Sequence, residues 1–295
     1  MSRKSPFLVM TLLVRNEEDI IAENILYHIH MGVDFFIVTD NGSSDSTRDI
    51  LLQFQQQGIL VLIDEPEDTY NQWKWVTRMA RMAHDDLKAE WVIHSDADEF
   101  WTARGGNLKL IFKTLPCDIN TVYVRRHDFA YRVDDPRPWH EALIYRKRRS
   151  LNHIGLPLPP KVAHRAAPGI VVTQGNHDVS GVEKRACMPP TLEILHFPVR
   201  SLAQFEKKIA CGGAAYERNT EIPKTLGRGW RRLYRLLKEQ GSLKSYLDAY
   251  GYTQSEIHEA LLRGELIEDC RIRDFIRSHP QLPWKAGCNA DAQGL

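Results

Sequence analysis

The chain has 295 residues, of which 43% are hydrophobic and 26% are charged, and its formal net charge is +1 at pH 7. This composition is ordinary for a globular protein with one large domain or two unequal ones. The balanced charge excludes a global field that would attract nucleic acid or repel an acidic ligand, so any basic site has to be local.

The five cysteines are scattered, odd in number and contain no Cys-x-x-Cys pair. This argues against a disulfide framework and against a zinc site, and it is typical of a reducing cytoplasm. The apolar run 7–14 is short and is followed at once by charged residues, so it predicts a buried strand and not a secretory leader. No run approaches the roughly 20 apolar residues that cross a bilayer. We therefore expect a cytoplasmic protein, with peripheral attachment at the inner face of the membrane left open.

The first hundred residues alternate predicted strands and helices with short joins. Strands are expected at 7–14, 34–39, 59–63 and 91–94, and helices at 17–31, 44–57 and 71–87. Strands made of continuous apolar runs indicate a mostly parallel central sheet that is flanked by helices on both faces. Such sheets bind ligands at the carboxyl ends of their strands, where Asn16, Asp40 and Asp96 are expected to lie.

After Trp101 the pattern changes. Mixed strands are expected at 120–124, 142–146 and 170–173, with proline-rich joins between them. From residue 201 onward the chain is predicted to be helical. The sequence thus predicts one α/β domain over residues 1–200 and a helical C-terminal extension over residues 201–295.

The stretch from Trp91 to Trp101 carries the strongest chemical signal. An apolar strand runs directly into Asp96, Asp98 and Glu99, with one small residue between the first two. In such an Asp-x-Asp pair both carboxylates can address one point, where hard oxygen ligands suit Mg²⁺ or Mn²⁺ and the metal grips a diphosphate. The alternative is a solvated acidic turn, but the flanking strand and the two aromatic residues that follow favour a metal site.

The join after the second predicted strand is the next informative feature. It ends a buried strand with Asp40 and Asn41, turns at a glycine and starts a helix. Ser44 or Asp45 can simply be the N-cap of that helix. Asp40 and Asn41 are suited instead to hydrogen-bond the edge of a base such as uracil.

The join after the first strand carries Arg15 and Asn16, a cation and an amide that suit a phosphate or a base. The alternative is structural, because Glu17 and Glu18 also suit a helix N-terminus through its macrodipole. The expected position of this join beside Asp40 favours binding.

Together these joins resemble the motifs of family 2 glycosyltransferases over about the first 105 residues. The motifs are Val14-Arg15-Asn16-Glu17, Asp40-Asn41-Gly42-Ser43-Ser44-Asp45 and Ser95-Asp96-Ala97-Asp98-Glu99-Phe100. The resemblance implies a GT-A fold, a nucleotide-binding half at 1–105, an acceptor-side half at 106–200, inverting transfer from a nucleotide sugar, and a divalent cation on the diphosphate. It implies that Asp40 and Asn41 reach the base, although Asn41 replaces a usual second acid and leaves the base open. Asp96 would reach the ribose or the metal, and Asp98 the metal.

Two later segments, 160–165 and 194–201, resemble the C-terminal half of a bacterial subgroup of these enzymes. His196 follows a strand and precedes Arg200 by four residues, so the two can supply a third metal ligand and a diphosphate contact. A structural role for His196 and a metal role for His177 are the alternatives. The predicted metal ligands are Asp96, Asp98 and His196, and the predicted nucleotide-sugar ligands are Arg15, Asn16, Asp40, Asn41, Asp45, Asp96, Lys161 and Arg200.

An inverting displacement needs a general base, usually a carboxylate, near the anomeric carbon. The acid pair that the family places beyond the Asp-x-Asp motif is not evident here. Asp128 is the first candidate, and Glu141 and Glu99 follow.

The helix predicted at 228–238 is basic and amphipathic. Such a helix can lie on an anionic membrane surface where a lipid-linked acceptor waits. The alternative is a packed helix with a solvated basic face. No RNA- or DNA-binding motif accompanies it, so we expect no nucleic-acid partner.

The sequence therefore predicts an inverting, metal-dependent glycosyltransferase. It would move a sugar from a nucleotide-sugar donor, expected to be a UDP-sugar, to a glycan or lipid-linked acceptor in cell-surface polysaccharide synthesis. A nucleotidyltransferase is a weaker alternative, because the join after the first strand has no glycine-rich phosphate loop. A non-catalytic carbohydrate-binding or scaffold protein is the other alternative, which would not need the base-binding turn and the metal motif together.

Overall fold

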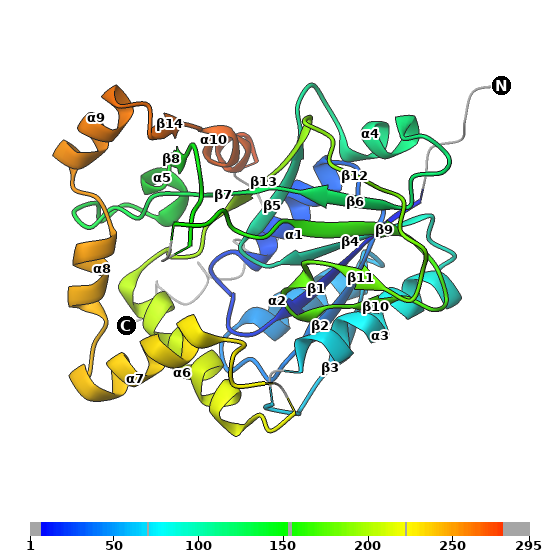
Figure 1. Cartoon of the computed structure of the whole chain (residues 1–295), viewed down its shortest axis with the longest axis horizontal. Helices are drawn as coiled ribbons and strands as arrows, with labels where there is room; N and C mark the ends of the chain where they lie inside the picture. Colours follow the sequence, from blue (N-terminus) through cyan, green and yellow to red (C-terminus); the bar gives the residue numbers. More distant parts are fainter. Residues whose placement is uncertain (1–6, 70, 153–154, 222, 280–295) are drawn as a thin grey trace, which may run out of the picture.

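The computed structural model describes residues 7–69, 71–152, 155–221 and 223–279. Its centre is a seven-stranded sheet in the order β12-β6-β9-β4-β1-β2-β3 (Figure 1). The strand bounds are β1 Leu8–Val14, β2 Phe35–Asp40, β3 Leu60–Asp64, β4 Trp91–Asp96, β6 Thr121–Val124, β9 Lys161–Arg165 and β12 Ala186–Cys187. Strands β3, β2, β1 and β4 are parallel neighbours, whereas β9 runs antiparallel to both β4 and β6. The predicted α/β class and mostly parallel sheet are confirmed.

Helices cover both faces of this sheet and continue towards the C-terminus. Their bounds are α1 Ile21–His30, α2 Thr47–Gln56, α3 Gln72–Asp85, α4 Leu108–Thr114, α5 Trp139–Ala142, α6 Leu202–Arg218, α7 Arg228–Gln240, α8 Lys244–Tyr250, α9 Gln254–Leu262 and α10 Arg271–Ser278. Successive side chains of a strand point to opposite faces, which explains the continuous apolar runs. On β1, Met10 and Leu12 pack in the core with α1 and α2, and Val9 packs in the core with α3.

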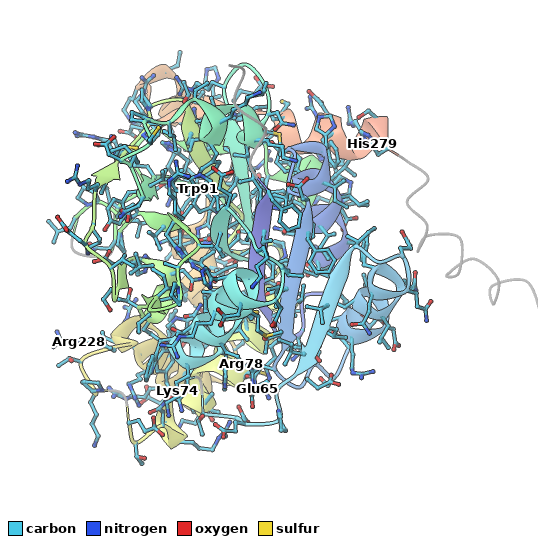
Figure 2. The ribbon with its side chains drawn as sticks, turned by 90° about the vertical axis from the view of Figure 1, so that its right-hand side faces the viewer. Glu65, Lys74, Arg78, Trp91, Arg228 and His279 are labelled. Carbon is cyan, nitrogen blue, oxygen red and sulfur yellow. The ribbon has the colours of Figure 1, made fainter. Side chains whose placement is uncertain are left out.

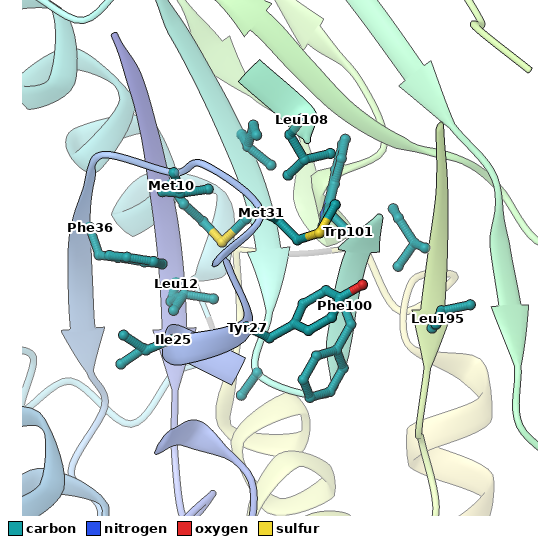
Figure 3. Close-up of a cluster of buried hydrophobic side chains, with 14 of the residues drawn as sticks. Met10, Leu12, Ile25, Tyr27, Met31, Phe36, Phe100, Trp101, Leu108 and Leu195 are labelled. Carbon is teal, nitrogen blue, oxygen red and sulfur yellow. The ribbon is translucent and has the colours of Figure 1, made fainter. Parts of the chain in front are cut away.

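The first of these cores contains methionine and aromatic side chains from distant parts of the chain. Figure 3 shows Met31, at the end of α1, beside Tyr27 and Trp101. The rings of Tyr27 and Phe100 meet edge to face with centroids 5.5 Å apart. This core fixes the segment after β4, because Phe100 and Trp101 are fully buried.

Smaller sheets complete the described structure, in the orders β5-β13-β7, β10-β11 and β14-β8. Their strands are β5 Glu99–Ala103, β7 Arg126–Asp128, β8 Tyr145–Lys147, β10 Val171–Val172, β11 Val179–Ser180, β13 Leu192–His196 and β14 Leu266–Glu268. The register of the first of these sheets pairs His196 with Glu99 on one side and with Asp128 on the other. Three residues that are far apart in sequence are thereby brought side by side.

Two elements differ from the prediction near their starts. The first helix begins at Ile21 and not at Glu17, because Asn16 has left-handed backbone dihedrals (φ 57°) and residues 17–20 form a turn. The strand expected at 142–146 begins only at Tyr145, because α5 ends at Ala142. Strands β5, β7, β9, β11, β12 and β14 were not predicted, because each has five residues or fewer and is too short to show a clear strand pattern.

The C-terminal segment packs against the α/β core. Phe275 of α10 meets the ring of Tyr27 edge to face at 5.1 Å, and β14 pairs with β8. The apolar side of α7 is also covered, since Leu233 packs in a core with Phe205 of α6. The predicted domain boundary at residue 200 stays a prediction. The last residues of the predicted C-terminal extension, 280–295, lie outside the described residues. Among the described helices, none combines the length and the apolar composition that crossing a bilayer requires.

Candidate active site

A cavity of about 580 Å³ opens at the carboxyl ends of β1 and β4. Residues that follow these strands form its floor, and α6 and α7 form its wall. Figure 1 shows α6 and α7 beyond the lower ends of the parallel strands. In Figure 2, Glu65, which follows β3, lies with Lys74 and Arg78 at this end of the sheet, and Arg78 pairs with Glu65 at 3.1 Å. The volume is in the range of small-molecule sites, roughly 300–1,000 Å³.

Asp98 is at the centre of the cavity floor. Its side chain is 3% exposed, its Oδ2 accepts from Lys208 Nζ at 2.5 Å, and its Oδ1 lies 3.6 Å from His196 Nε2. Burial opposes the charge on this carboxyl, but Lys208 and His196 outweigh burial and hold the pKa of Asp98 well below its usual value. Asp98 is therefore ionised at neutral pH.

His196 connects Asp98 to a second carboxylate. Its Nδ1 lies 2.7 Å from Asp128 Oδ1. Burial opposes protonation of this imidazole, yet Asp98 and Asp128 together raise the pKa of His196 to about 9. The ring is thus an imidazolium at neutral pH and donates from Nδ1. Asp128 lies behind His196 and is absent from the described lining of the cavity, so this predicted base does not reach the cavity directly.

Asp96 is the more open member of the Asp-x-Asp pair, with a side chain 33% exposed. Its Oδ2 accepts from Lys161 Nζ at 2.5 Å, and its Oδ1 accepts from Gln72 and Asn176 at 3.3 and 3.2 Å. Burial opposes the charge on Asp96, but Lys161 outweighs it and lowers the pKa. Asp96 and Lys161 both line the cavity, as predicted for nucleotide-sugar ligands.

Glu99 lies beneath this pair and is fully buried. It accepts from Arg126 Nη1 at 3.1 Å and from the N–H of Asp96 at 3.2 Å, and Lys161 Nζ lies 3.2 Å away. Glu99 therefore anchors cations under the floor and is absent from the described cavity lining. The third predicted base, Glu141, pairs with Arg277 near the C-terminal end of α10.

The predicted metal ligands do not come together as a three-ligand group. Within the described ranges, no set of three or more His, Cys, Asp or Glu side chains is arranged to hold an ion. The carboxylates of Asp96 and Asp98 are suitable oxygen donors, but each is bound by a lysine ammonium, and His196 is protonated. As arranged, these residues do not fit a divalent cation. The alternative ligand His177 lines the cavity, where Nδ1 contacts the carbonyl of Pro160 at 2.9 Å.

Asn16 ties the loops after β1 and β2 together. Its Oδ1 accepts from the N–H of Ser44 at 2.8 Å, and its own N–H donates to Ser43 Oγ at 3.0 Å. Asp40, which is 2% exposed, accepts from the hydroxyl and the N–H of Ser43. Asn16 lines the cavity, whereas Asp40 shapes the turn behind it.

Asn41 lines the cavity and Asp45 stands at the start of α2. Asn41 Nδ2 donates to the carbonyls of Glu65 and Glu67 at 3.0 and 2.7 Å, which orients the amide at the end of β2. Asp45 accepts from the N–H and the hydroxyl of Thr47 at 3.0 and 2.6 Å. The N-cap itself is Ser46, so Asp45 supports the first turn of α2 from one residue before the N-cap, and its predicted role as a ligand stays a prediction.

The two predicted arginine ligands differ in position. Arg15 lines the cavity and pairs with Asp68 at 2.6 Å. The side chain of Arg200 is 1% exposed and is held by Glu17 at 2.5 Å and by Asp19 at 2.7 Å. It is absent from the described cavity lining and instead joins the turn at 17–20 to the segment after β13.

Sequence analysis missed Lys208, which lies 110 residues from its partner Asp98. The signal available in the sequence was the spacing of Phe205, Lys208, Ile209 and Gly212, a pattern that places side chains on one helix face. All four line the cavity. The sequence predicted the helix but did not show what this face would meet.

Residues 9–114 match the sequence model of glycosyltransferase family 92. A family 92 protein from Oryza sativa subsp. japonica is 30% identical over 103 residues, which cover 33% of this chain and 16% of that protein. The alignment thus spans well under a fifth of this relative. The match to the family model, at residues 9–114, includes all but the first residue of β1, the strands β2 to β4, and the Asp-x-Asp pair.

Solved glycosyltransferase structures are similar at a low level. Staphylococcus aureus TarS 1–349 in complex with UDP has a TM-score of 0.41 and 11% identity, over 78% of this chain and 71% of that chain. Mannosyltransferase PcManGT from Pyrobaculum calidifontis, in complex with GDP-Man and Mn²⁺, has a TM-score of 0.41 and 15% identity, over 99% and 89%. Similarity this low says nothing about the ligands of the present chain. The resemblance to glycosyltransferases is confirmed for residues 9–114, where the matching family is family 92, and the family 2 assignment stays a prediction.

Proposed function

We propose that the protein is a glycosyltransferase that binds a nucleotide sugar in the cavity at the ends of β1 and β4. The observation that carries this proposal is the ionised Asp98 on the cavity floor, with Lys208 and His196 as its cationic partners. It lies beside the strand-end loops in the segment that matches family 92 glycosyltransferases. A glycan or lipid-linked molecule is the proposed acceptor.

The cavity supplies charge for a departing nucleoside diphosphate. Negative charge accumulates on the diphosphate as its bond to the sugar breaks, and fixed cations in a partly desolvated site stabilise that charge. Lys161, Lys208 and Arg126 line the cavity, and their positions are set by the buried carboxylates beneath them. Asp128 acts as a positioning residue, because it orients the His196 ring against Asp98.

The proposed displacement is inverting, so a base has to remove the proton of the acceptor hydroxyl. Such a base has to reach the acceptor. Among the described residues, the carboxylates that line the cavity are Glu17, Asp96 and Asp98. We therefore place the general base among these three and not at Asp128, Glu99 or Glu141.

The proposed donor is a UDP-sugar, and the metal requirement predicted from the sequence is left to experiment. A cation at Asp96 and Asp98 would require Lys161 and Lys208 to turn away. As part of the same proposal, the protein works in the cytoplasm on acceptors of cell-surface polysaccharide. The exposed Arg232 and Arg235 of α7 can then face anionic lipid at the inner side of the membrane.

The test is thermal unfolding of the protein with UDP, GDP, CDP and ADP, each with Mn²⁺ and with EDTA. A ligand that binds only the folded protein raises the unfolding midpoint. We expect one nucleotide to raise it clearly more than the others, and the Mn²⁺ and EDTA arms to show whether a metal is needed. Equal midpoints with all four nucleotides in both arms would contradict the proposal and favour a non-catalytic protein.

A further inference from the structure

We propose that Lys208 binds the diphosphate of the donor, the role that the sequence assigned to Arg200. This role rests on the proposed function, and it means that Lys208 would favour a nucleoside diphosphate over the nucleoside and its monophosphate. It follows from three properties of Lys208: its position in the cavity, its unused donors, and the contrast with the other buried cations.

Position comes first. Lys208 lies on the face of α6 that forms the cavity wall, and its side chain is 24% exposed. The start of α6 is fixed by Ser201, whose hydroxyl accepts from the N–H of Gln204 at 3.1 Å. A rigid helix thus carries the ammonium group to the floor beside Asp98. A ligand that enters the cavity meets Lys208 without any change in the backbone.

The ammonium group has donors to spare. A lysine ammonium has three N–H donors. Among the described residues, Asp98 is the one group that accepts a hydrogen bond from Lys208. The other two donors can bind phosphate oxygens while the contact with Asp98 persists, so Asp98 would orient the ammonium towards the ligand.

Two other buried cations, Arg200 and Lys161, are less available. The guanidinium of Arg200 donates to Glu17, to Asp19 and to the carbonyl of Phe197, and the residue lies outside the described cavity lining. Lys161 is 1% exposed and lies between Asp96 and Glu99. Lys208 is paired with one carboxylate at hydrogen-bond distance and is far more exposed than Lys161.

A purely structural role is the competing explanation, in which Lys208 does no more than neutralise Asp98. The two roles differ in their dependence on ligand length. If Lys208 binds the diphosphate, its removal lowers the affinity for the nucleoside diphosphate and leaves the affinity for the nucleoside unchanged. If Lys208 has only a structural role, its removal lowers the stability of the protein or weakens the binding of all these ligands alike.

The experiment is calorimetric titration of the nucleoside, its monophosphate and its diphosphate, using UDP or whichever nucleotide raises the unfolding midpoint most. Lys208→Met is compared with the wild type and with Lys244→Met, which removes an exposed lysine paired with Asp248 on α8. We expect Lys208→Met to weaken binding of the nucleoside diphosphate roughly 10- to 100-fold, which corresponds to the loss of one charged hydrogen bond. Nucleoside affinity should stay unchanged, and Lys244→Met should match the wild type. Each titration is run with Mn²⁺ and with EDTA.

A second variant covers the case in which Lys208→Met fails to fold because Asp98 is left unpaired. The double variant Lys208→Met with Asp98→Asn carries no unpaired charge at this position. We call the increase in affinity from the nucleoside to its diphosphate the diphosphate gain. Removing the negative charge of Asp98 alone should favour an anionic ligand, so a smaller diphosphate gain in the double variant would still point to Lys208. A diphosphate gain equal to that of the wild type in either variant would overturn this proposal and leave the proposed function standing. Failure of the wild type to bind any of the ligands would overturn the proposed function as well.

Discussion

Two buried charge networks in this protein use different cations, and the difference separates a site from a structural joint. The site network lies at the cavity and joins lysines and a histidine to aspartates: Lys161, Lys208, His196, Asp96, Asp98 and Asp128. The C-terminal network lies between β13, β8 and the start of α10 and joins arginines to acids: Arg146, Arg271, Glu193 and Asp269. Both lie largely out of solvent. Among the described residues, most members of the first network line the large cavity, and no member of the second does.

The C-terminal network is held by the planar forks of its arginines. Arg271 donates from Nε and Nη2 to the two carboxylate oxygens of Asp269 at 2.9 and 2.5 Å, and from Nη1 to Glu193 at 2.8 Å. Arg146 donates to Asp269 at 2.9 Å. Bidentate pairs of this kind fix geometry as well as charge. This network therefore ties the C-terminal segment to the sheets.

The site network has contacts at single points. Lys208 meets Asp98, and Lys161 meets Asp96 and Glu99, each through one ammonium group whose donors can rotate towards a new partner. Its charges can therefore be shared with a ligand without unfolding the surrounding structure. The proposed function assigns binding to the lysine network, and we expect the arginine network to stabilise the fold.

The largest expected effect is on the arginine network. Arg146, which is 10% exposed, is the more buried of its two arginines, and Arg146→Met leaves Glu193 and Asp269 short of a partner. Breaking a buried ion pair costs roughly 3–5 kcal/mol of unfolding free energy. Urea denaturation measures this loss, and titration with the stabilising nucleotide should give an unchanged affinity. The comparison would fail if Arg146→Met weakened nucleotide binding while the unfolding free energy stayed the same.

Asp98→Asn tests the other network. We expect sugar transfer from the nucleotide sugar to fall roughly 100- to 1000-fold, about 2.7–4 kcal/mol, because the cations around the reacting bond lose the carboxylate that positions them. The assay follows release of the nucleoside diphosphate, and circular dichroism confirms that the variant is folded. A folded Asp98→Asn protein that turns over as fast as the wild type would show that Asp98 has no role in the transfer.

His196 gives the site network a dependence on pH. Its pKa of about 9 in the folded protein lies above the unfolded value of about 6.5. The stabilisation is therefore complete below pH 6.5 and is lost as pH rises through 9, with a limit of roughly 3 kcal/mol. Urea denaturation from pH 6 to 9.5 should show this decline in the wild type and a much smaller one in His196→Gln. Parallel declines in the two proteins would contradict the assignment.

The smallest effect is expected outside both networks. Arg232 and Arg235 of α7 are exposed, so changing both to alanine should alter the unfolding free energy by less than about 0.5 kcal/mol per site. Binding to vesicles that contain anionic lipid should weaken by about 1 kcal/mol for each charge removed. Sedimentation with such vesicles measures this change, and equal binding of the double variant and the wild type would exclude α7 from membrane contact.

The sequence predicted the features that depend on local signals. Strands β1 to β4 are apolar runs that end in polar residues, so both the sheet and the positions of Asn16, Asn41 and Asp96 could be expected. The tertiary pairing of charges could not. The spacing of His196 and Arg200 suggested a diphosphate contact, but it did not show that the turn at 17–20 would take up the guanidinium.

Register and distance explain the other differences. Asp128 was predicted to be a base, and the alignment of β7 with β13 places it against His196 instead of the cavity. Lys208 was missed because its partner Asp98 precedes it by 110 residues, and helix periodicity alone does not identify what a face will contact.

The most direct measurement is a crystal structure of the protein with the nucleoside diphosphate that raises its unfolding midpoint. We predict density in the cavity at the ends of β1 and β4, with the base near Asn41 and the diphosphate against Lys208 beside Asp98. Density for the nucleotide at another place, such as the smaller cavity lined by Arg104 and Arg125, would contradict the account.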